Sequence, residues 1–140
     1  MHKIIAPAAL VLGLALAAPA LASPLDGVWL TPEKNGTVRI YECGPAICGK
    51  ILDSDNIRAN PAITDEKNKD ASLRSRPMKD LQIITGVTGG PRVWKNGSVY
   101  NPEDGGTYHG SLTLIDPDTV KLEGCVIYPF CKSEVWRRVK

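Results

Sequence analysis

Apolar and polar residues alternate with a period of two in several short stretches of the chain. In the stretch 37–42, Val38 and Ile40 fall on one face and the residues that follow each of them fall on the other. The same alternation recurs at 106–115 and 119–125. Successive side chains of a strand point to opposite faces, whereas the apolar positions of a helix repeat every three or four residues. These stretches therefore predict half-buried β-strands.

Turn-forming residues separate these stretches at short intervals. Asn35-Gly36 and Asn96-Gly97 are predicted to be hairpin turns, because both residues of an Asn-Gly pair tolerate a positive φ. Further turn signals lie at 44–45, 103–106 and 116–119. The predicted strands are 26–31, 37–43, 47–52, 81–88, 91–95, 98–101, 106–115 and 119–125, with a closing strand at 132–139. We therefore expect an all-β fold, a single antiparallel β-barrel of about eight strands whose closure protects the strand edges.

The segment 53–79 breaks this rhythm. It is polar and rich in Asp, Asn, Lys and Arg, and one short helical turn is predicted near 70–74. Loops of this length in compact domains are usually functional or disordered. The segment is therefore a candidate contact surface.

Two arginines are the sharpest polar feature of this segment. Arg74 and Arg76 lie two residues apart, on one face of an extended stretch, and Pro77 favours extended backbone at Arg76. Such a pair could clamp a carboxylate or a phosphate of a ligand. Alternatively, each arginine pairs with Asp65, Asp70 or a loop carbonyl and fixes the segment to the barrel.

The N-terminal residues have the pattern of a secretory signal peptide. Lys3 precedes an apolar run at 4–18, and Ala20 and Ala22 form an A-x-A cleavage site. The run is shorter than the roughly 20 residues that a membrane-spanning helix needs, although an uncleaved anchor remains the alternative. We expect residues 1–22 to be removed after Ala22, leaving one domain at 23–140, without a membrane span, in the periplasm or outside the cell.

Four cysteines follow the expected cleavage site. An even number of cysteines in an exported domain indicates disulfides, and four cysteines allow three pairings. We favour Cys43–Cys48 and Cys125–Cys131, because each pair flanks a short apolar segment with a turn. A zinc site is the alternative, but the second pair does not have the usual ligand spacing.

Charge and catalytic motifs narrow the classes of function. The formal net charge is +2 at pH 7, and no basic cluster of the kind that binds nucleic acids is present in the sequence. After cleavage His109 is the only histidine, and the chain has no nucleophile elbow, phosphate-binding loop or dinucleotide motif. Asp53 and Asp55 begin like a calcium loop, but Ile57 and Arg58 occupy positions that would need other residues. We expect no catalytic residue, no metal, no cofactor and no nucleic-acid partner.

The order of several motifs resembles the bacterial exported domain-of-unknown-function 2147 family. The matching motifs are Leu25-Asp26-Gly27-Val28-Trp29, Cys43-Gly44, Cys48-Gly49, Asp65-x-x-Asn68, Leu73-Arg74-Ser75-Arg76-Pro77, Tyr100-Asn101-Pro102-x-x-Gly105-x-x-Tyr108, Leu112-Thr113-Leu114 and Val135-Trp136-Arg137-Arg138-Val139. The chain departs from the family at Asn101, where Asp is common, and at Met78, where Leu is common. The resemblance implies a lipocalin-like, calycin-type barrel and no established activity.

The first strand also resembles the calycin G-x-W signature. Gly27 and Trp29 stand in these positions. The resemblance implies that Trp29 packs at the barrel floor against an arginine near the end of the last strand, with Arg138 as the first choice and Arg137 as the second. A guanidinium stacked on an indole contributes about 0.5–2 kcal/mol.

The sequence favours two classes of function over an enzyme. The first is non-enzymatic binding of a small, mainly apolar or amphipathic ligand inside the barrel. The expected interior residues are Val38, Ile40, Leu112, Leu114, Val120 and Leu122. Tyr100 and Tyr108 flank the turn at 101–105 and either offer hydroxyls to the ligand or cap the core. The second class is an interaction module with a filled barrel that contacts partners through the segment 53–79. An enzyme is the third choice, and the sequence does not indicate the oligomeric state.

Overall fold

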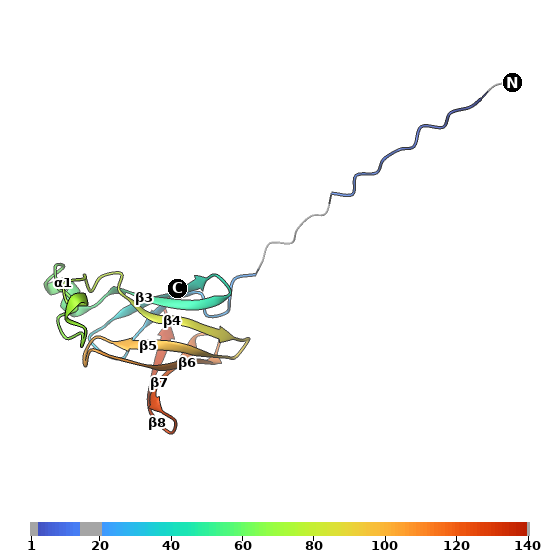
Figure 1. Cartoon of the computed structure of the whole chain (residues 1–140). Helices are drawn as coiled ribbons and strands as arrows, with labels where there is room; N and C mark the ends of the chain where they lie inside the picture. Colours follow the sequence, from blue (N-terminus) through green and yellow to red (C-terminus); the bar gives the residue numbers. More distant parts are fainter. Residues whose placement is uncertain (1–2, 15–20, 140) are drawn as a thin grey trace.

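Eight antiparallel strands form a closed barrel in which each strand pairs with the next and the last pairs with the first (Figure 1). The computed structural model describes residues 3–14 and 21–139. The strands are β1 (Gly27–Leu30), β2 (Thr37–Cys43), β3 (Ala46–Asp53), β4 (Gln82–Gly89), β5 (Val93–Asn101), β6 (Gly106–Asp116), β7 (Thr119–Ile127) and β8 (Phe130–Arg138). The fold class predicted from the alternation of apolar and polar residues is confirmed.

The two Asn-Gly pairs have different roles. Asn35 has a φ of 47° and lies in the turn between β1 and β2, as predicted. Asn96 has a φ of 65° but lies inside β5, where the pairing with β6 shifts register between Trp94 and Gly97. The prediction of two strands at 91–95 and 98–101 is therefore wrong, because the positive φ forms a bulge in one continuous strand. A side chain at Gly97 would meet the Thr85 carbonyl oxygen at 2.4 Å, so the bulge brings two strand backbones close together.

The connection between β3 and β4 carries the only helices of the described residues. Helix α1 (Asp55–Ala59) begins after Ser54, whose side chain accepts a hydrogen bond from the Ile57 amide at 3.2 Å. Helix η1 (Ala71–Leu73) is the short turn expected near 70–74. The sequence reasoning missed α1, although a serine before an acidic first turn is a typical N-cap signal. Ile57 is buried and anchors α1.

The two ends of the barrel differ. The closed end carries the turns at 44–45, 90–92 and 117–118, and the open end carries the turns at 31–36, 102–105 and 128–129 together with the segment 54–81. Figure 1 places α1 at the open end. The largest fully buried apolar side chains include Trp29, Ile40, Ile84, Val87, Leu112 and Val120. We describe these six residues as the floor.

Trp29 and Arg138 form a plug in the floor. The Arg138 guanidinium lies 4.4 Å from the centre of the Trp29 ring, and the Trp29 indole donates to the Leu25 carbonyl at 2.9 Å. Arg138 also donates to the Asp26 carbonyl at 2.8 Å. Arg137 is exposed, so Arg138 is the arginine that the tryptophan contacts.

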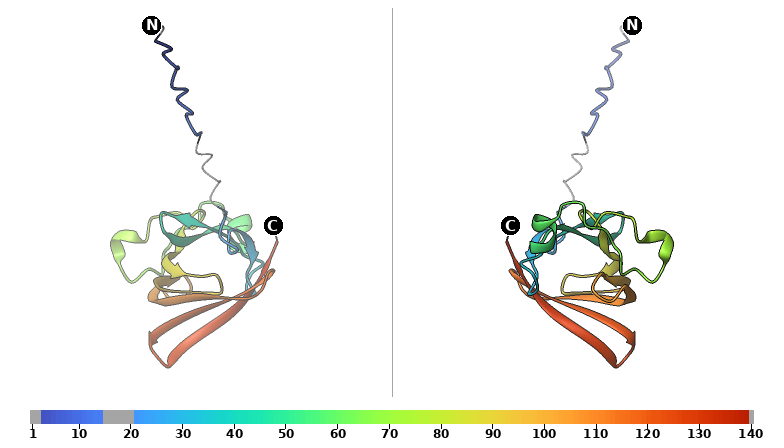
Figure 2. Two further views of the ribbon diagram at one scale, coloured as in Figure 1. Left: turned by 90° about the vertical axis from the view of Figure 1, so that its right-hand side faces the viewer. Right: turned by 90° about the vertical axis from the view of Figure 1, so that its left-hand side faces the viewer.

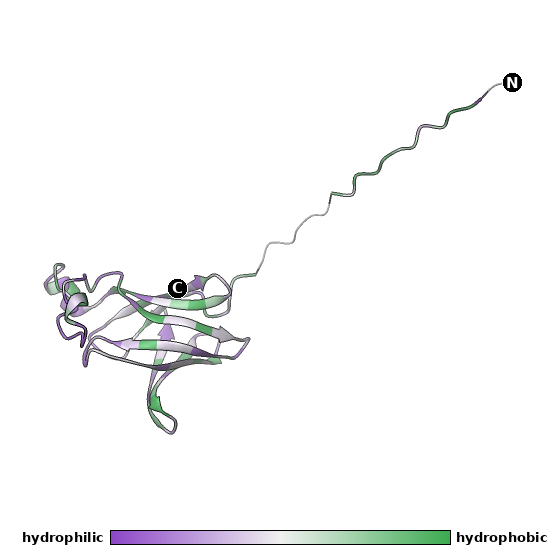
Figure 3. Ribbon diagram, in the orientation of Figure 1, coloured by the Kyte–Doolittle hydropathy of each residue, from purple (hydrophilic) through white to green (hydrophobic). Residues whose placement is uncertain are grey.

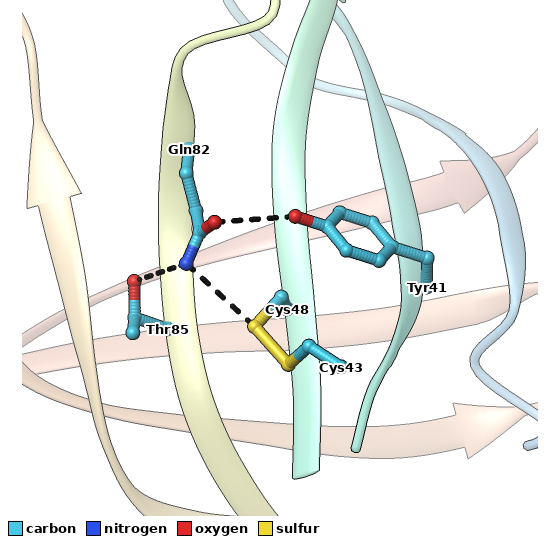
Figure 4. Close-up of a disulfide and its surroundings, with 5 residues drawn as sticks. All are labelled: Tyr41, Cys43, Cys48, Gln82 and Thr85. Carbon is cyan, nitrogen blue, oxygen red and sulfur yellow. Dashed lines mark hydrogen bonds between the residues drawn. A yellow bond between two sulfur atoms is a disulfide. The ribbon is translucent and has the colours of Figure 1, made fainter.

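The disulfides are Cys43–Cys48 and Cys125–Cys131. The first closes the β2–β3 hairpin, where Figure 4 shows the Tyr41 hydroxyl donating to Gln82 on β4. The second joins β7 to β8 close to the turn of their hairpin. Both pairings are those favoured from the sequence.

The N-terminal segment has no helix or strand over residues 3–14. Ala20 of the expected cleavage site lies outside the described residues. In the described part of the chain, no helix combines the length and apolar character needed to cross a bilayer.

Candidate ligand-binding cavity at the open end

The open half of the barrel contains a cavity of about 630 Å³. Its apolar wall is formed by inward-facing side chains from five strands. These side chains are Val38, Ile83, Val99, Leu122 and Trp136. All five are buried, and Ile51, Ile63 and Met78 extend the apolar lining towards the mouth. The barrel is thus filled at one end and hollow at the other.

Charged residues surround the mouth. Lys34 donates to Glu103 at 2.8 Å and joins the β1–β2 turn to the β5–β6 turn. Hydrogen bonding to Glu103 and its negative charge raise the pKa of Lys34. Lys132 and Glu134 line the cavity from β8, and the Glu134 carboxylate accepts from the Trp136 indole at 2.9 Å. The mouth therefore offers both signs of charge to a polar group.

Tyr108 is oriented by a carboxylate at the mouth. Its hydroxyl donates to Asp104 at 2.5 Å, and the Gly106 amide donates to the other oxygen of the same carboxylate at 2.8 Å. Burial alone would raise the pKa of Asp104, but these two hydrogen bonds, together with the positive charges of Lys69 and Lys132, outweigh it and lower the pKa. The hydrogen bond to Asp104 raises the pKa of Tyr108. The phenol is therefore neutral at physiological pH and can accept from a ligand.

A buried carboxylate connects the long segment to the barrel. Asp65 is 0 % exposed and accepts from the Tyr100 hydroxyl on β5. It also accepts from the Arg76 Nε at 3.0 Å and from the Asn68 Nδ2 at 2.9 Å. The Arg76 guanidinium lies 5.4 Å from the centre of the Tyr100 ring. We call Asp65, Asn68, Arg76 and Tyr100 the Asp65 network.

The Asp65 network also controls the chemistry of Tyr100. Burial, followed by the hydrogen bond to Asp65 and its negative charge, raises the pKa of Tyr100 to about 12. Each donor facing Asp65 satisfies part of a carboxylate that has no contact with water. The network therefore holds the segment 54–81 beside the cavity mouth.

Gly105 allows the neighbouring turn to pack against the same segment. It has a φ of 72°, and a side chain there would lie 1.8 Å from the Lys67 carbonyl oxygen. The Lys69 amide donates to the Gly105 carbonyl at 3.4 Å. Only glycine combines this backbone conformation with this close approach.

The four ligand-binding candidates from the sequence divide into two groups. Tyr100 and Tyr108 line the cavity. Arg74 and Arg76 do not: Arg76 is directed at Asp65, and Arg74 donates to the Asn68 carbonyl at 2.7 Å. The geometry therefore supports the structural alternative for both arginines.

The expected interior residues also divide along the barrel axis. Val38 and Leu122 line the cavity. Ile40, Leu112 and Val120 lie in the floor instead, and Leu114 is partly buried against the core. Alternation shows which side chains point inward, but it does not show how far along the axis the barrel is filled. The same reasoning missed Lys34, Glu103, Lys132 and Glu134, because isolated surface charges carry no motif.

The remaining chemical candidates, His109 and the group of Glu123, Cys125 and Cys131, do not form a catalytic or metal site among the described residues. His109 is exposed on β6. Glu123 lies close to Cys125 and Cys131, but the two sulfurs are bonded to each other and are not available as thiolate ligands.

Comparison with known proteins supports the fold. A solved structure described as protein HP1028 from the human pathogen Helicobacter pylori, which belongs to the lipocalin family, matches with a TM-score of 0.73 and 22% identity over 83% of each chain. A redesigned β-barrel matches with a TM-score of 0.45 and 20% identity, over 84% of this chain and 94% of the other. No curated protein matches. The model of a bacterial family described as "Uncharacterized protein conserved in bacteria (DUF2147)" matches residues 27–138, and the chain belongs to this family.

Proposed function

We propose that this protein binds a small apolar or amphipathic molecule in the cavity at the open end of the barrel, without catalysing a reaction on it. The observation that carries the proposal is the cavity of about 630 Å³, with an apolar wall and a charged mouth. Pockets for small ligands are typically about 300–1,000 Å³ and combine mainly apolar walls with a few polar groups. The cavity falls within this range.

The division between wall and mouth favours an amphipathic ligand. An apolar body would lie against Val99, Leu122 and Trp136, where each Å² removed from water contributes about 25 cal/mol. A polar end would remain near Lys132, Glu134 or Tyr108, since these groups offer both donors and acceptors. The floor below this wall is filled, so the ligand would reach only the open half.

We also propose that the protein acts outside the cytoplasm after loss of residues 1–22. Two disulfides suit an oxidising compartment. The Ser23 nitrogen donates to the Glu42 carboxylate at 2.9 Å, so cleavage after Ala22 would place a new ammonium group beside a negative charge. The intact mass of protein from the envelope should correspond to a chain that begins at Ser23. A mass that includes Met1 would contradict this part of the proposal.

Filling the cavity tests the binding proposal. Leu122→Trp should place an indole in the cavity and weaken the binding of a fluorescent apolar dye at least tenfold. Lys121→Trp is the matched control, because position 121 points to the opposite face of β7. The control should bind the dye as the native protein does. Native mass spectrometry on the same preparations should show a co-purifying small molecule only where the cavity is open.

Two outcomes would contradict the proposal. One is equal dye affinity in the native protein, Leu122→Trp and Lys121→Trp, with circular dichroism showing that all three are folded. The other is a native protein that neither carries a small molecule nor takes up any apolar dye.

A further inference from the structure

Strand β8 is paired with β1 over only a short part of its length. β1 pairs with β8 at Arg137 and Arg138. By contrast, β7 pairs with β8 along its length, from Phe130 to Arg137. Within the described chain, the stretch 130–136 therefore has a neighbouring strand on one side only. Figures 1 and 2 show the β7–β8 hairpin extending away from the rest of the barrel.

In the stretch 130–136, every second residue directs its backbone N–H and C=O groups away from β7, where no strand of the described chain pairs with them. The Cα atoms of Cys125 and Cys131 are 4.0 Å apart. This short distance is typical of a pair whose backbone groups do not bond to each other, for which the usual value is about 4.5 Å. The direction of the backbone N–H and C=O groups alternates along a strand. From Cys131 onward, every second residue therefore presents these groups to the side without a neighbouring strand. These residues are Cys131, Ser133 and Val135.

The tip of the same hairpin is apolar. Val126, Ile127, Tyr128 and Phe130 are between 66% and 83% exposed. Figure 3 shows a hydrophobic stretch on this hairpin, apart from the barrel core. A free strand edge beside an exposed apolar patch is a template for pairing with another chain.

We propose that two copies of this protein pair through their β8 strands, antiparallel, about a two-fold axis at Ser133. In this register Lys132 of each copy lies opposite Glu134 of the other. Opposite charges directly across two antiparallel strands are stabilising. Neither residue forms an ion pair within the described part of a single chain. The sequence of β8 is thus complementary to itself, as a two-fold interface requires.

Other symmetric registers fit less well. The residues that point to the free side must face one another, so the axis passes either through one of them or through Lys132 or Glu134 between them. An axis at Lys132 or at Glu134 would place two like charges directly opposite each other, which is destabilising. An axis at Cys131 would place Lys132 opposite Phe130 and leave Val135 without a partner. An axis at Val135 would require Arg137, which already pairs with Leu30 of β1. The axis at Ser133 uses all three free positions and gives about six backbone hydrogen bonds.

The pairing would also change the cavity mouth. Lys132 and Glu134 line the cavity of their own chain. In the paired form each copy places charged groups beside the mouth of the other. This inference goes beyond ligand binding and does not depend on it, since it rests on the unpaired edge of β8, the charges along that edge and the apolar hairpin tip.

Charge exchange provides the test. Lys132→Glu makes both positions acidic, and Glu134→Lys makes both basic, so each variant alone should sediment as a monomer. A mixture of the two in equal amounts restores opposite charges and should sediment with about twice the chain mass. The native protein at the same micromolar concentration should also be dimeric.

A proline variant tests the role of the backbone. Ser133→Pro removes an N–H that points away from β7, so the barrel should remain folded while the dimer is lost. Ser133→Ala is the matched control and should remain dimeric.

Three results would overturn the proposal. The first is a native protein that is monomeric throughout the micromolar range, including one that instead binds phospholipid vesicles through the hairpin tip. The second is a dimer that persists in folded Ser133→Pro. The third is a mixture of the two charge variants that remains monomeric.

Discussion

At the scale of single residues, the contact between Trp29 and Arg138 makes the clearest energetic prediction. Trp29→Ala empties a fully buried site and should lower the free energy of unfolding by about 3–5 kcal/mol. Arg138→Ala should cost less, because it removes stacking and carbonyl contacts but leaves a smaller gap. Arg137→Ala is the matched control and should change stability by about 0.5 kcal/mol or less.

Urea unfolding of the three variants measures these costs. A Trp29→Ala protein within about 1 kcal/mol of the native protein would show that this ring does not close the barrel.

A second residue-scale prediction concerns Tyr100 and pH. The folded protein holds the pKa of Tyr100 at about 12, above the ordinary value of 10.0. A raised pKa means that the folded state retains the proton longer than the unfolded state does. The contribution of Tyr100 to stability is therefore complete below about pH 10 and is lost as the pH rises through about 12.

Chemical unfolding at increasing pH, with Tyr100→Phe as the comparison, measures this contribution. The native protein should lose stability more steeply above about pH 10 than the variant does. Parallel curves for the two proteins would show that the Asp65 network does not hold the phenol in its neutral form.

At the scale of elements, the two arginines of the long segment should behave differently. Arg76→Ala leaves the buried Asp65 short of donors and should lower the free energy of unfolding by about 1–3 kcal/mol. Arg74→Ala removes one bond from an exposed side chain to the Asn68 carbonyl and should cost about 1 kcal/mol or less.

Neither arginine lines the cavity, so both folded variants should still bind an apolar dye. Thermal melting and dye titration on the same preparations check both statements. A double variant that melts like the native protein but no longer binds dye would make this segment the ligand site.

The limits of sequence reasoning are also clearest at the element scale. Alternation located the strands, because a period of two has few alternative explanations. It did not separate a turn from a bulge at Asn96, since both use a residue with positive φ. The acidic residues of the segment 53–79 indicated Asp65 as a partner for the arginines. Only the fold shows that the Tyr100 hydroxyl on β5 reaches the same carboxylate.

At the scale of the whole molecule, the two halves of the barrel differ in how they are filled. Large aromatic and branched side chains fill the closed half, and the open half retains a cavity. Composition could not reveal this division, because inward-facing residues of both halves are equally apolar. The seam between β1 and β8 was equally hidden, since it depends on how few residues of these two strands pair. Both features follow from the way the barrel closes in three dimensions. The ligand-binding proposal depends on the cavity, and the dimer proposal depends on the short pairing of β1 with β8.

The most direct test of the binding proposal is the location of a bound apolar dye, measured by methyl NMR. Signals of Val38, Val99 and Leu122 in the cavity wall should shift on titration, while those of Ile84 and Leu112 in the floor should not. Shifts confined to Ile127 at the hairpin tip, which does not line the cavity, or no shift at any of these methyl groups, would contradict ligand binding in the cavity.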